Sequence, residues 1–465
     1  MVLIGMGIKE GVLLFKKAFR HIIRFYKTQA IIVTFLVLIT FGATLLNLPA
    51  ASRNGQSIGF LNAFFTATSA TCVTGLIVVD TYQHWTLFGQ IVILVLIQIG
   101  GLGFMTVATL FSLFLKRTIS LSERLLISES LNYDNMSGIV RLVKHIMVGT
   151  AVVELLGAAF LSIRLVPQFG FKTGVYKSVF HSISAFCNAG FDVMGINAPF
   201  VSLTKYVFDP LVVFTISALI IIGGIGFFVW EDIYSYRKKL RLHTKIALTI
   251  TSALLVGGTI CFYFLEGENP GTFLGMTWAQ KFYASFFQSV SPRTAGFNTI
   301  ALSKLTPPSK IITILLMFIG GSPGSTAGGI KTVTFGVTVL TALSVTRGSH
   351  RVNVFGRSLS NSVIYRSFTI VMIAMLVVMV GIVALSITEN ASLSDIVFEV
   401  FSAFGTVGLT LGLTPHLTNA GKAIIIVIMY FGRVGVLTVA LGLMKMMNSG
   451  VEDKIKHPEE KILVG

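Results

Sequence analysis

The sequence is poor in charge and in proline, and it has few cysteines and tryptophans. Only 12% of its 465 residues are charged, about half of the roughly 25% typical of soluble domains. With 54% hydrophobic residues and a mean hydropathy of +0.83, this shortage excludes a soluble fold of this size. Three cysteines, Cys72, Cys187 and Cys261, have spacings that fit neither a zinc site nor a disulfide framework. Glycine is abundant instead, at 45 residues, so we expect the glycines to have local roles.

Eight apolar stretches are long enough to cross the hydrocarbon core of a bilayer, which takes about 20 residues in a helix. They lie near residues 29–48, 88–115, 144–166, 207–230, 243–265, 310–345, 366–388 and 421–447. Four apolar pieces of about ten residues lie between the members of successive pairs and are too short to span, which favours re-entrant segments. These pieces are Phe60–Ala70, Tyr176–Phe186, Lys281–Val290 and Ser394–Phe404. The sequence therefore predicts an all-α polytopic membrane protein.

Lysine and arginine are distributed unequally between the two sides of these crossings. One side holds 24 of the 36 basic residues and the other holds 10, while Lys331 and Arg433 lie within crossings. The positive-inside rule then places both termini in the cytoplasm, and the short pieces enter from outside. The basic stretch Gly11–Lys27 is predicted to be an interfacial helix, with a frayed tail as the alternative. The net charge of +17 thus reflects membrane topology rather than a nucleic-acid partner.

One motif occurs four times, because each short piece ends near a glycine followed by Leu or Phe. These glycines are Gly75, Gly190, Gly296 and Gly408, and a second glycine cluster follows each, at Gly100–Gly103, Gly223–Gly226, Gly320–Gly324 and Gly432–Gly435. Units with an even number of crossings share one orientation, which predicts four parallel helix–pore-loop–helix repeats with pseudo-fourfold symmetry around a central pore. The predicted repeats cover residues 29–116, 117–231, 232–346 and 347–447, between a cytoplasmic segment 1–28 and a cytoplasmic tail 448–465.

The four glycine loops have a chemistry suited to cations. Non-helical backbone at membrane depth is tolerated where it lines a water-filled path, so we expect the loops to line the pore. Glycine permits positive φ, which lets a short loop turn its carbonyl oxygens toward one axis. Rings of carbonyl oxygens replace the hydration shell of a potassium-like ion. The C-terminal ends of four short helices would add partial negative charge beside them.

The motifs TATSATCVTGL, SAFCNAGF, SPRTAGFN and SAFGTVGLT resemble the Trk/Ktr/HKT superfamily of potassium transporters over nearly the whole chain. The leading segment is short, so the resemblance is greatest to KtrB-like membrane subunits of the Ktr type. That resemblance implies gated potassium uptake in the plasma membrane, dependence on sodium, and a homodimer in the lipid bilayer. It also implies a separate cytosolic RCK ring (KtrA/KtrC-like) that binds nucleotides, so this chain is expected to bind potassium, with sodium as a second ion, and no nucleotide.

Carried over by position, the resemblance assigns twelve residues to a selectivity filter. They are Val73, Thr74, Gly75, Asn188, Ala189, Gly190, Thr294, Ala295, Gly296, Thr406, Val407 and Gly408. With one glycine per loop, we expect fewer ordered carbonyl layers than in tetrameric potassium channels, and looser selectivity.

The sixth crossing contains a glycine-rich run that is unlike a helix. Its residues are Gly320, Gly321, Ser322, Pro323, Gly324, Ser325, Thr326, Ala327, Gly328, Gly329, Ile330 and Lys331. Glycine costs about 1 kcal/mol and proline about 3 kcal/mol in a helix interior, so this run is predicted to unwind. It is not a phosphate-binding loop, because Ile330 separates Gly329 from Lys331 and no strand precedes it. The resemblance implies a gate below the filter; the alternative is a packing kink.

Charges inside crossings are costly and therefore candidates for function. We hypothesise that the guanidinium of Arg433 donates to carbonyls of the predicted gate and repels resting cations, while Lys331 snorkels to the cytoplasmic face. Arg293 and Glu399 are predicted either to pair or to meet backbone and water separately. Glu154 is either a proton or sodium site or a partner in interhelical hydrogen bonding.

Three further predictions concern residues around the filter and on the cytoplasmic face. Asp80 and Asp192 are predicted to concentrate cations at the outer mouth. Cys72 and Cys187, each three residues before a filter glycine, are predicted to be packing residues rather than metal ligands. The basic loops Arg237–Lys245 and Arg347–Arg366 suit either a regulatory partner or anionic lipid.

The main functional alternative is a proton- or sodium-coupled secondary transporter, which predicts inverted repeats and clustered acids at the membrane midplane. The chain shows parallel units and one isolated acid, Glu154, at that depth. An intramembrane metalloenzyme is not indicated, because the sequence has no His-Glu-x-x-His motif. We therefore predict a transport protein and not an enzyme.

Overall fold

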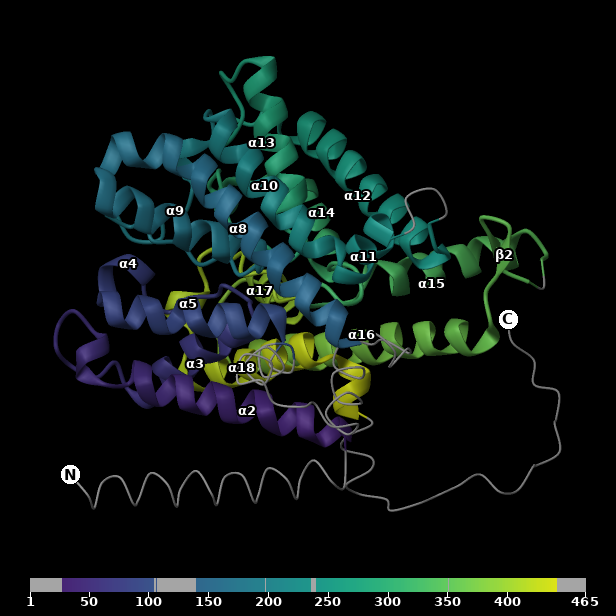
Figure 1. The fold of residues 1–465 in the computed structure, drawn as a ribbon, viewed down its shortest axis with the longest axis horizontal. Helices are drawn as coiled ribbons and strands as arrows, with labels where there is room; N and C mark the ends of the chain where they lie inside the picture. The colour runs from purple at the N-terminus through teal and green to yellow at the C-terminus, as the bar shows by residue number, and fades with distance from the viewer. Residues whose placement is uncertain are drawn as a thin grey trace.

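The computed structural model describes residues 27–103, 106, 139–196, 198–235, 240–349 and 351–440. The predictions made for most of Gly11–Lys27, for Arg237–Lys239 and for the tail 448–465 lie outside these residues. The described chain is mostly helical, with its longer helices running roughly along one axis (Figure 1). It also contains one small antiparallel hairpin, which pairs β1 (Asn353–Val354) with β2 (Arg357–Ser358).

The first member of each predicted pair of crossings forms one long helix. These helices are α2 (Lys27–Leu46), α8 (Ile139–Phe169), α12 (Leu242–Glu266) and α16 (Asn361–Thr388). By length and composition α8, α12 and α16 could each span a membrane. Large apolar side chains along one face of α16 are exposed, including Met372 (68%), Leu376 (64%) and Val380 (60%). Such a face requires an apolar solvent and indicates contact with lipid.

The four short apolar pieces are also helices, close to where the sequence predicts them. They are α3 (Phe60–Thr71), α9 (Phe171–Phe186), α13 (Trp278–Val290) and α17 (Leu393–Gly405). Three of their phenylalanines, Phe65, Phe186 and Phe404, are fully or almost fully buried within one extended hydrophobic cluster. The short helices therefore form the centre of the molecule, and the long helices cover them.

The second member of each pair is broken, which corrects the predicted continuous stretches. Three of them form 16-residue helices: α5 (Leu87–Leu102), α10 (Pro210–Ile225) and α18 (Asn419–Val434). Each ends at a glycine of positive φ, namely Gly103 (82°), Gly226 (101°) and Gly435 (93°). After Gly226 the chain turns by 86° into α11 (Phe227–Ser235). A glycine in this conformation stops a helix without a steric penalty.

The fourth of these stretches is interrupted where the sequence predicts it. Helix α14 (Pro307–Phe318) ends, and α15 (Thr332–Thr346) begins 14 residues after that end. The intervening residues 319–331, which we name the intramembrane loop, fold back on themselves, so that Ile319 and Ile330 form a parallel bridge.

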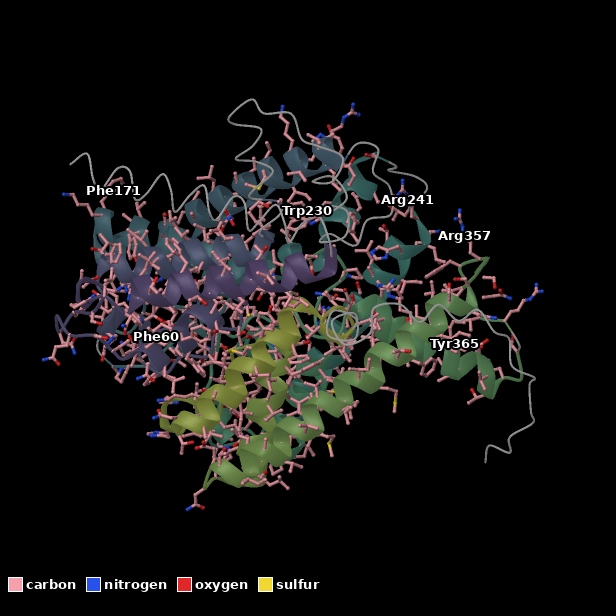
Figure 2. All side chains as sticks on the ribbon, turned by 90° about the horizontal axis from the view of Figure 1, so that it is seen from below. Phe60, Phe171, Trp230, Arg241, Arg357 and Tyr365 are labelled. Carbon is pink, nitrogen blue, oxygen red and sulfur yellow. The ribbon has the colours of Figure 1, made fainter. Side chains whose placement is uncertain are left out.

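The remaining elements are short. They are η1 (Pro49–Ala51), α4 (Thr81–His84), η2 (Thr204–Tyr206), η3 (Leu302–Lys304) and η4 (Thr414–His416). Phe60 and Phe171, where two short helices begin, lie toward one end of the long axis, and Arg241 and Arg357 lie toward the other (Figure 2). We name these ends the outer and the inner side.

Candidate functional site

The loops that follow the four short helices share one backbone pattern. The glycines at their centres, Gly75, Gly190, Gly296 and Gly408, have φ of 90°, 69°, 76° and 89°. Two residues earlier, Val73, Asn188, Thr294 and Thr406 have φ of 58°, 60°, 71° and 49°, whereas the residue between is not left-handed. Left-handed backbone costs a non-glycine residue roughly 1–2 kcal/mol, and such strain gathers at functional sites. Alternating conformations turn successive carbonyls to one side of the chain.

The four central glycines contact one another's loops in a closed ring. A Cβ atom added to Gly75 would lie within 3.0 Å of the carbonyl oxygen of Ala189. The same holds for Gly190 with Ala295, Gly296 with Val407, and Gly408 with Thr74. The contacts run in chain order and return to the first loop. We name these four residues the glycine ring, and it has no room for a side chain at any of its four positions.

The glycine ring opens into a cavity on the outer side. The cavity has a volume of about 380 Å³, and all four ring glycines line it. Its other lining groups include the carboxylate of Asp192, the hydroxyls of Ser202 and Thr410, and the imidazole of His416. The ring is therefore accessible from outside through a partly polar vestibule.

Serine side chains hold the loops, a role that sequence reasoning missed. Ser69 and Ser402 each accept a hydrogen bond from the N–H of the ring glycine six residues later, at 3.1 Å. Ser184, at the same spacing, donates to the carbonyl of Phe191 at 2.7 Å, and Ser291 donates to Phe297. The sequence contained a signal for this role, because each of the four loop motifs has a serine five or six residues before its ring glycine.

The short helices pack end-on against the second helices through glycine. A Cβ on Gly100, Gly223 or Gly432 would overlap the carbonyl oxygen of Thr71, Phe186 or Phe404, respectively. Each of these carbonyls lies four residues before a ring glycine. Three short helices therefore end at the ring at the same depth, where helix C-termini carry partial negative charge.

The intramembrane loop lies directly on the inner side of the ring. Cβ atoms on Gly320 and Gly328 would meet the side chains of Thr294 and Thr406, the left-handed residues of the third and fourth loops. The hydroxyl of Thr326 donates to the carbonyl of Phe186 at 3.1 Å. The loop is therefore in contact with three of the four loops that carry the ring.

Backbone hydrogen bonds fix the intramembrane loop to the broken ends of two second helices. The N–H of Ser322 donates to Gly224 at 2.9 Å, and the N–H of Phe227, the first residue of α11, donates to Gly324 at 2.8 Å. The N–H of Gly329 donates to Gly432 in α18 at 3.2 Å.

Arg433 donates to the loop, as hypothesised, and also connects it to a third broken helix, which was not expected. Its guanidinium donates to the carbonyl of Thr326 in the loop and to the carbonyls of Gly100 and Gly101 at the end of α5. The ammonium of Lys331 donates to Ala327 at 2.6 Å. The prediction that Lys331 snorkels to the inner face is therefore wrong, because a loop carbonyl within reach binds its charge.

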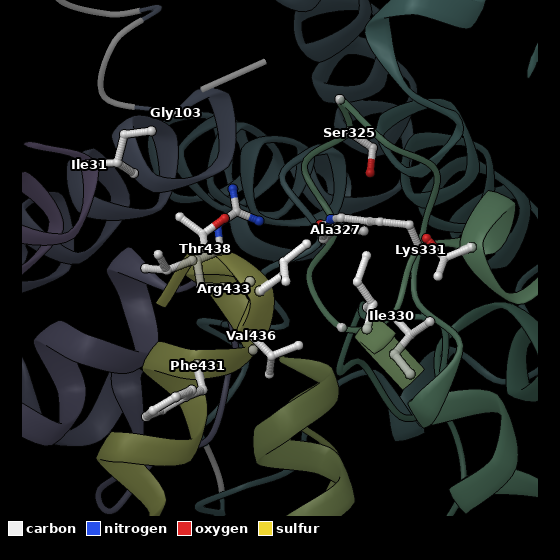
Figure 3. A pocket seen from close by; sticks show the side chains of 18 of the residues that line it. Ile31, Gly103, Ser325, Ala327, Ile330, Lys331, Phe431, Arg433, Val436 and Thr438 are labelled. Carbon is white, nitrogen blue, oxygen red and sulfur yellow. Dashed lines mark hydrogen bonds between the residues drawn. The ribbon is translucent and has the colours of Figure 1, made fainter. Parts of the chain in front are cut away.

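Both cations line an inner cavity of about 230 Å³, on the opposite side of the loop from the glycine ring. The side chains of Arg433 and Lys331 point toward each other from opposite sides of this cavity (Figure 3). Among the described residues neither forms an ion pair with an acid, since the ion pairs found there are His145–Glu231, Arg164–Asp209 and Arg241–Asp232. Backbone carbonyls of the loop and of the end of α5 supply the compensating negative charge instead.

The predicted Arg293–Glu399 pair does not form; the alternative of a separate backbone partner holds for Arg293, whereas Glu399 is bound by threonine hydroxyls. Arg293 donates to the carbonyl of Gly320 at 3.4 Å. Glu399 accepts hydrogen bonds from the hydroxyls of Thr410, at 2.7 Å, and Thr414. The guanidinium and the carboxylate therefore each have hydrogen-bond partners of their own, and neither needs the other as an ion-pair partner.

Glu154 and the cysteines have structural partners. Both carboxylate oxygens of Glu154 accept from the amide of Gln98, at 3.0 and 3.2 Å, which is the interhelical hydrogen bond predicted as one alternative. Cys72 and Cys187 are free and buried. Among the described residues no three His, Cys, Asp or Glu side chains gather as metal ligands.

The two acids predicted at the outer mouth differ in their positions. Asp80 caps α4 and accepts from the N–H groups of Tyr82, Gln83 and Phe200, so its role is structural. Asp192 lines the outer cavity, where burial raises its pKa to about 6.

Lys177, which the sequence analysis did not single out, lies fully buried behind Asp192. It donates to the carbonyl of Val193 at 2.5 Å, and the rings of Tyr82 and Phe169 lie 4.7 and 4.6 Å from its nitrogen. Its charge partly opposes the rise in the pKa of Asp192.

Comparisons with known proteins agree with this architecture. The chain matches the TrkH family, described as cation transport protein, over residues 6–455. It is 44% identical to the potassium/sodium uptake protein NtpJ of Enterococcus hirae, over 95% of this chain and 98% of that protein. It is also 44% identical to the Ktr system potassium uptake protein B of Bacillus subtilis, with the same coverage of both chains.

A solved structure shows the same fold. The potassium transporter TrkH from Vibrio parahaemolyticus matches with a TM-score of 0.71 at 18% identity, covering 89% of this chain and 84% of that one. The comparisons thus support a membrane transport protein and not an enzyme, as the sequence predicts.

Proposed function

The chain belongs to the TrkH family of cation transport proteins, and from that premise we propose that it conducts potassium inward through a gated, channel-like pore. The selectivity filter of this proposal consists of the twelve loop residues that the sequence resemblance assigns, with the glycine ring at its centre. The observation that carries it is the shared left-handed pattern of the four loops around the ring, which can present carbonyl oxygens to a dehydrated cation. The four repeats, with the boundaries given above, surround this path with pseudo-fourfold symmetry.

The intramembrane loop is the gate. Residues 319–331 lie between the ring and the inner cavity, so a cation that leaves the filter inward meets them first. Arg433 and Lys331 hold the loop through its carbonyls and place positive charge beside the path. Opening therefore requires that the loop move away from the broken ends of the second helices.

The regulation and assembly that we propose rest on the family resemblance. Two Ktr system proteins and NtpJ are named for potassium uptake, and NtpJ is also named for sodium. We place this chain in the plasma membrane with both termini in the cytoplasm, as one subunit of a homodimer. Sodium supports its activity, and a cytosolic RCK ring that binds nucleotides moves the gate.

Rubidium uptake into cells that lack their own potassium uptake systems tests the proposal. The chain is expressed with and without an RCK partner, in the presence and absence of external sodium, and its amount in the membrane is measured. Uptake that depends on the partner and is competed by potassium is expected. If the chain is in the membrane but uptake instead follows a proton or sodium gradient and potassium does not compete, a secondary transporter is favoured.

Asp192 should make uptake sensitive to external pH. Its pKa of about 6 means that the carboxylate is charged at pH 7.5 and becomes neutral as the external pH falls through 6. A unit charge acting over about 8 Å of water changes the energy of a cation by about 0.5 kcal/mol, or about two- to threefold in affinity. We expect the KM for rubidium to rise by this factor between pH 7.5 and pH 5, with little change in maximal rate.

The Asp192→Asn variant, which has no charge to lose, should show the raised KM already at pH 7.5 and should match the parent chain at pH 5. His416, the other ionisable side chain that lines this cavity, is the matched control and is replaced in His416→Gln. A pH dependence that persists in Asp192→Asn and disappears in His416→Gln would contradict the assignment.

A further inference from the structure

A large groove lies between α8 and α11, away from the proposed ion path. It has a volume of about 910 Å³, and both basic and aromatic side chains line it. The lining residues include Arg141, Lys144, Val148, Trp230 and Tyr234. The first three recur at a spacing of three and four residues along α8, so they share one helix face.

The groove carries unbalanced positive charge. Glu231, the acid among its lining residues, is bound to His145 at 3.0 Å. Arg141 and Lys144 are exposed and form no ion pair with any residue that the structure describes. The groove therefore suits an anionic group that can lie between the two basic side chains.

The groove also has the features of a membrane surface. Farther along α8, Leu155 is 69% exposed, and Val148 and Val152 are 56% and 49% exposed, which indicates contact with acyl chains. Helix α11 turns by 86° from α10, and its Tyr234 is 73% exposed. Aromatic side chains beside basic ones are typical of the headgroup level of a bilayer.

We propose that this groove binds the headgroup of an anionic phospholipid of the inner leaflet, with the phosphate between Arg141 and Lys144 and an acyl chain along α8. Basic pockets between membrane helices recognise such headgroups. The inner position rests on the orientation proposed above, but the binding chemistry does not require that the chain conduct potassium.

The groove is connected to the intramembrane loop by direct contacts. The ring of Trp230 lies 5.8 Å from the ring of Phe186, the last residue of α9. The N–H of Phe227, which also lines the groove, donates to Gly324 in the loop at 2.8 Å. A lipid that holds α11 against α8 therefore stabilises the position of the loop.

Quenching of tryptophan fluorescence measures binding directly. The chain has three tryptophans, so Trp85→Phe with Trp278→Phe leaves Trp230 as the reporter (Figure 2). The protein is placed in vesicles of phosphatidylcholine and phosphatidylglycerol in which bromine is carried by one lipid or by the other, at equal amounts. About 1 kcal/mol for each basic residue gives an expected preference for phosphatidylglycerol of about 25-fold for two residues.

Arg141→Gln with Lys144→Gln should remove this preference. Arg351→Gln with Arg357→Gln, at the hairpin on the inner side, is the matched control and should retain it. Equal quenching by the two brominated lipids in the parent protein, or the same preference in the Arg141/Lys144 variant, would overturn the proposal.

Rubidium flux from vesicles provides a second measurement that keeps the native tryptophans. Flux should differ between pure phosphatidylcholine and mixed vesicles in the parent chain and lose that difference in the Arg141/Lys144 variant. An equal response to phosphatidylglycerol in both proteins would place the lipid elsewhere. Quenching remains measurable if no flux occurs at all, so failure of the proposed transport function is distinguishable from failure of the lipid site.

Discussion

Gly408→Ser is expected to reduce rubidium uptake at least tenfold, with the protein still present in the membrane. Gly408 has a φ of 89°, and a Cβ atom there would lie within 3.0 Å of the carbonyl oxygen of Thr74 and the Cα of Gly75. Serine must therefore displace the neighbouring loop as well as strain its own backbone. A tenfold loss corresponds to about 1.4 kcal/mol, which we attribute to displacement of the neighbouring loop.

The neighbouring Gly412 offers a matched control. Its φ is 114°, so serine there is strained in the same sense, but no atom lies within 4 Å of the position that a Cβ would occupy. It also lines the same outer cavity. Gly412→Ser should therefore keep most of the uptake, and the difference between the two variants measures the effect of the ring contact rather than that of backbone strain.

Selectivity gives the sharper measurement. If the ring carbonyls coordinate the ion, the residual uptake of Gly408→Ser should discriminate less between rubidium and sodium than the parent chain does, because displaced oxygens no longer match one ion size. Residual uptake with unchanged selectivity and an equal loss in Gly412→Ser would argue against the glycine ring as the filter.

The sequence predicted the local elements of this fold well. The short helix α3 begins at Phe60, as predicted, because a ten-residue apolar run bounded by glycine has little choice of structure inside an apolar core. The intramembrane loop was also predicted, since five glycines and one proline cannot form a stable helix there. Both conclusions depend on residues close together in the chain.

What the sequence could not predict depends on backbone conformation and on distant partners. The left-handed backbone of Val73, Thr294 and Thr406 could not be predicted, because β-branched residues rarely adopt that conformation without tertiary constraint. The predicted Arg293–Glu399 pair was wrong because an alignment of the four repeats indicates how deep a residue lies in the membrane but not the direction in which its side chain points. The breaks at Gly103, Gly226 and Gly435 were missed although their glycine clusters had been identified, since glycine is also an ordinary packing residue in membrane helices.

Arg433→Gln is expected to raise resting rubidium flux, measured without an RCK partner, by about tenfold or more. The parent guanidinium joins the intramembrane loop at Thr326 to the end of α5 at Gly100 and Gly101. Glutamine removes the charge and is too short to make all of these bonds. Hydrogen bonds to charged groups contribute about 1.5–3 kcal/mol each, so losing one or two of them is enough for such a shift toward the open gate.

Arg164→Gln is the matched control for this variant. Arg164 is also an arginine with a short hydrogen bond, to Asp209 at 2.6 Å, but its side chain is 53% exposed and lies on the outer half of α8. Its loss should leave resting flux unchanged. If resting and partner-activated flux both stay at the parent level in Arg433→Gln, Arg433 does not hold the gate closed.

Arg433→Lys separates the two ways in which this residue can hold the path closed. Lysine keeps the positive charge but cannot reach the loop and α5 with a planar, forked group at the same time. If repulsion of resting cations dominates, the lysine variant should behave as the parent chain does. If the bonds to Thr326, Gly100 and Gly101 dominate, its resting flux should approach that of Arg433→Gln, and we expect this second result. One carbonyl of the loop and two at the end of α5 already offset the charge that would repel a cation, whereas nothing else among the described residues ties the loop to α5 through a side chain.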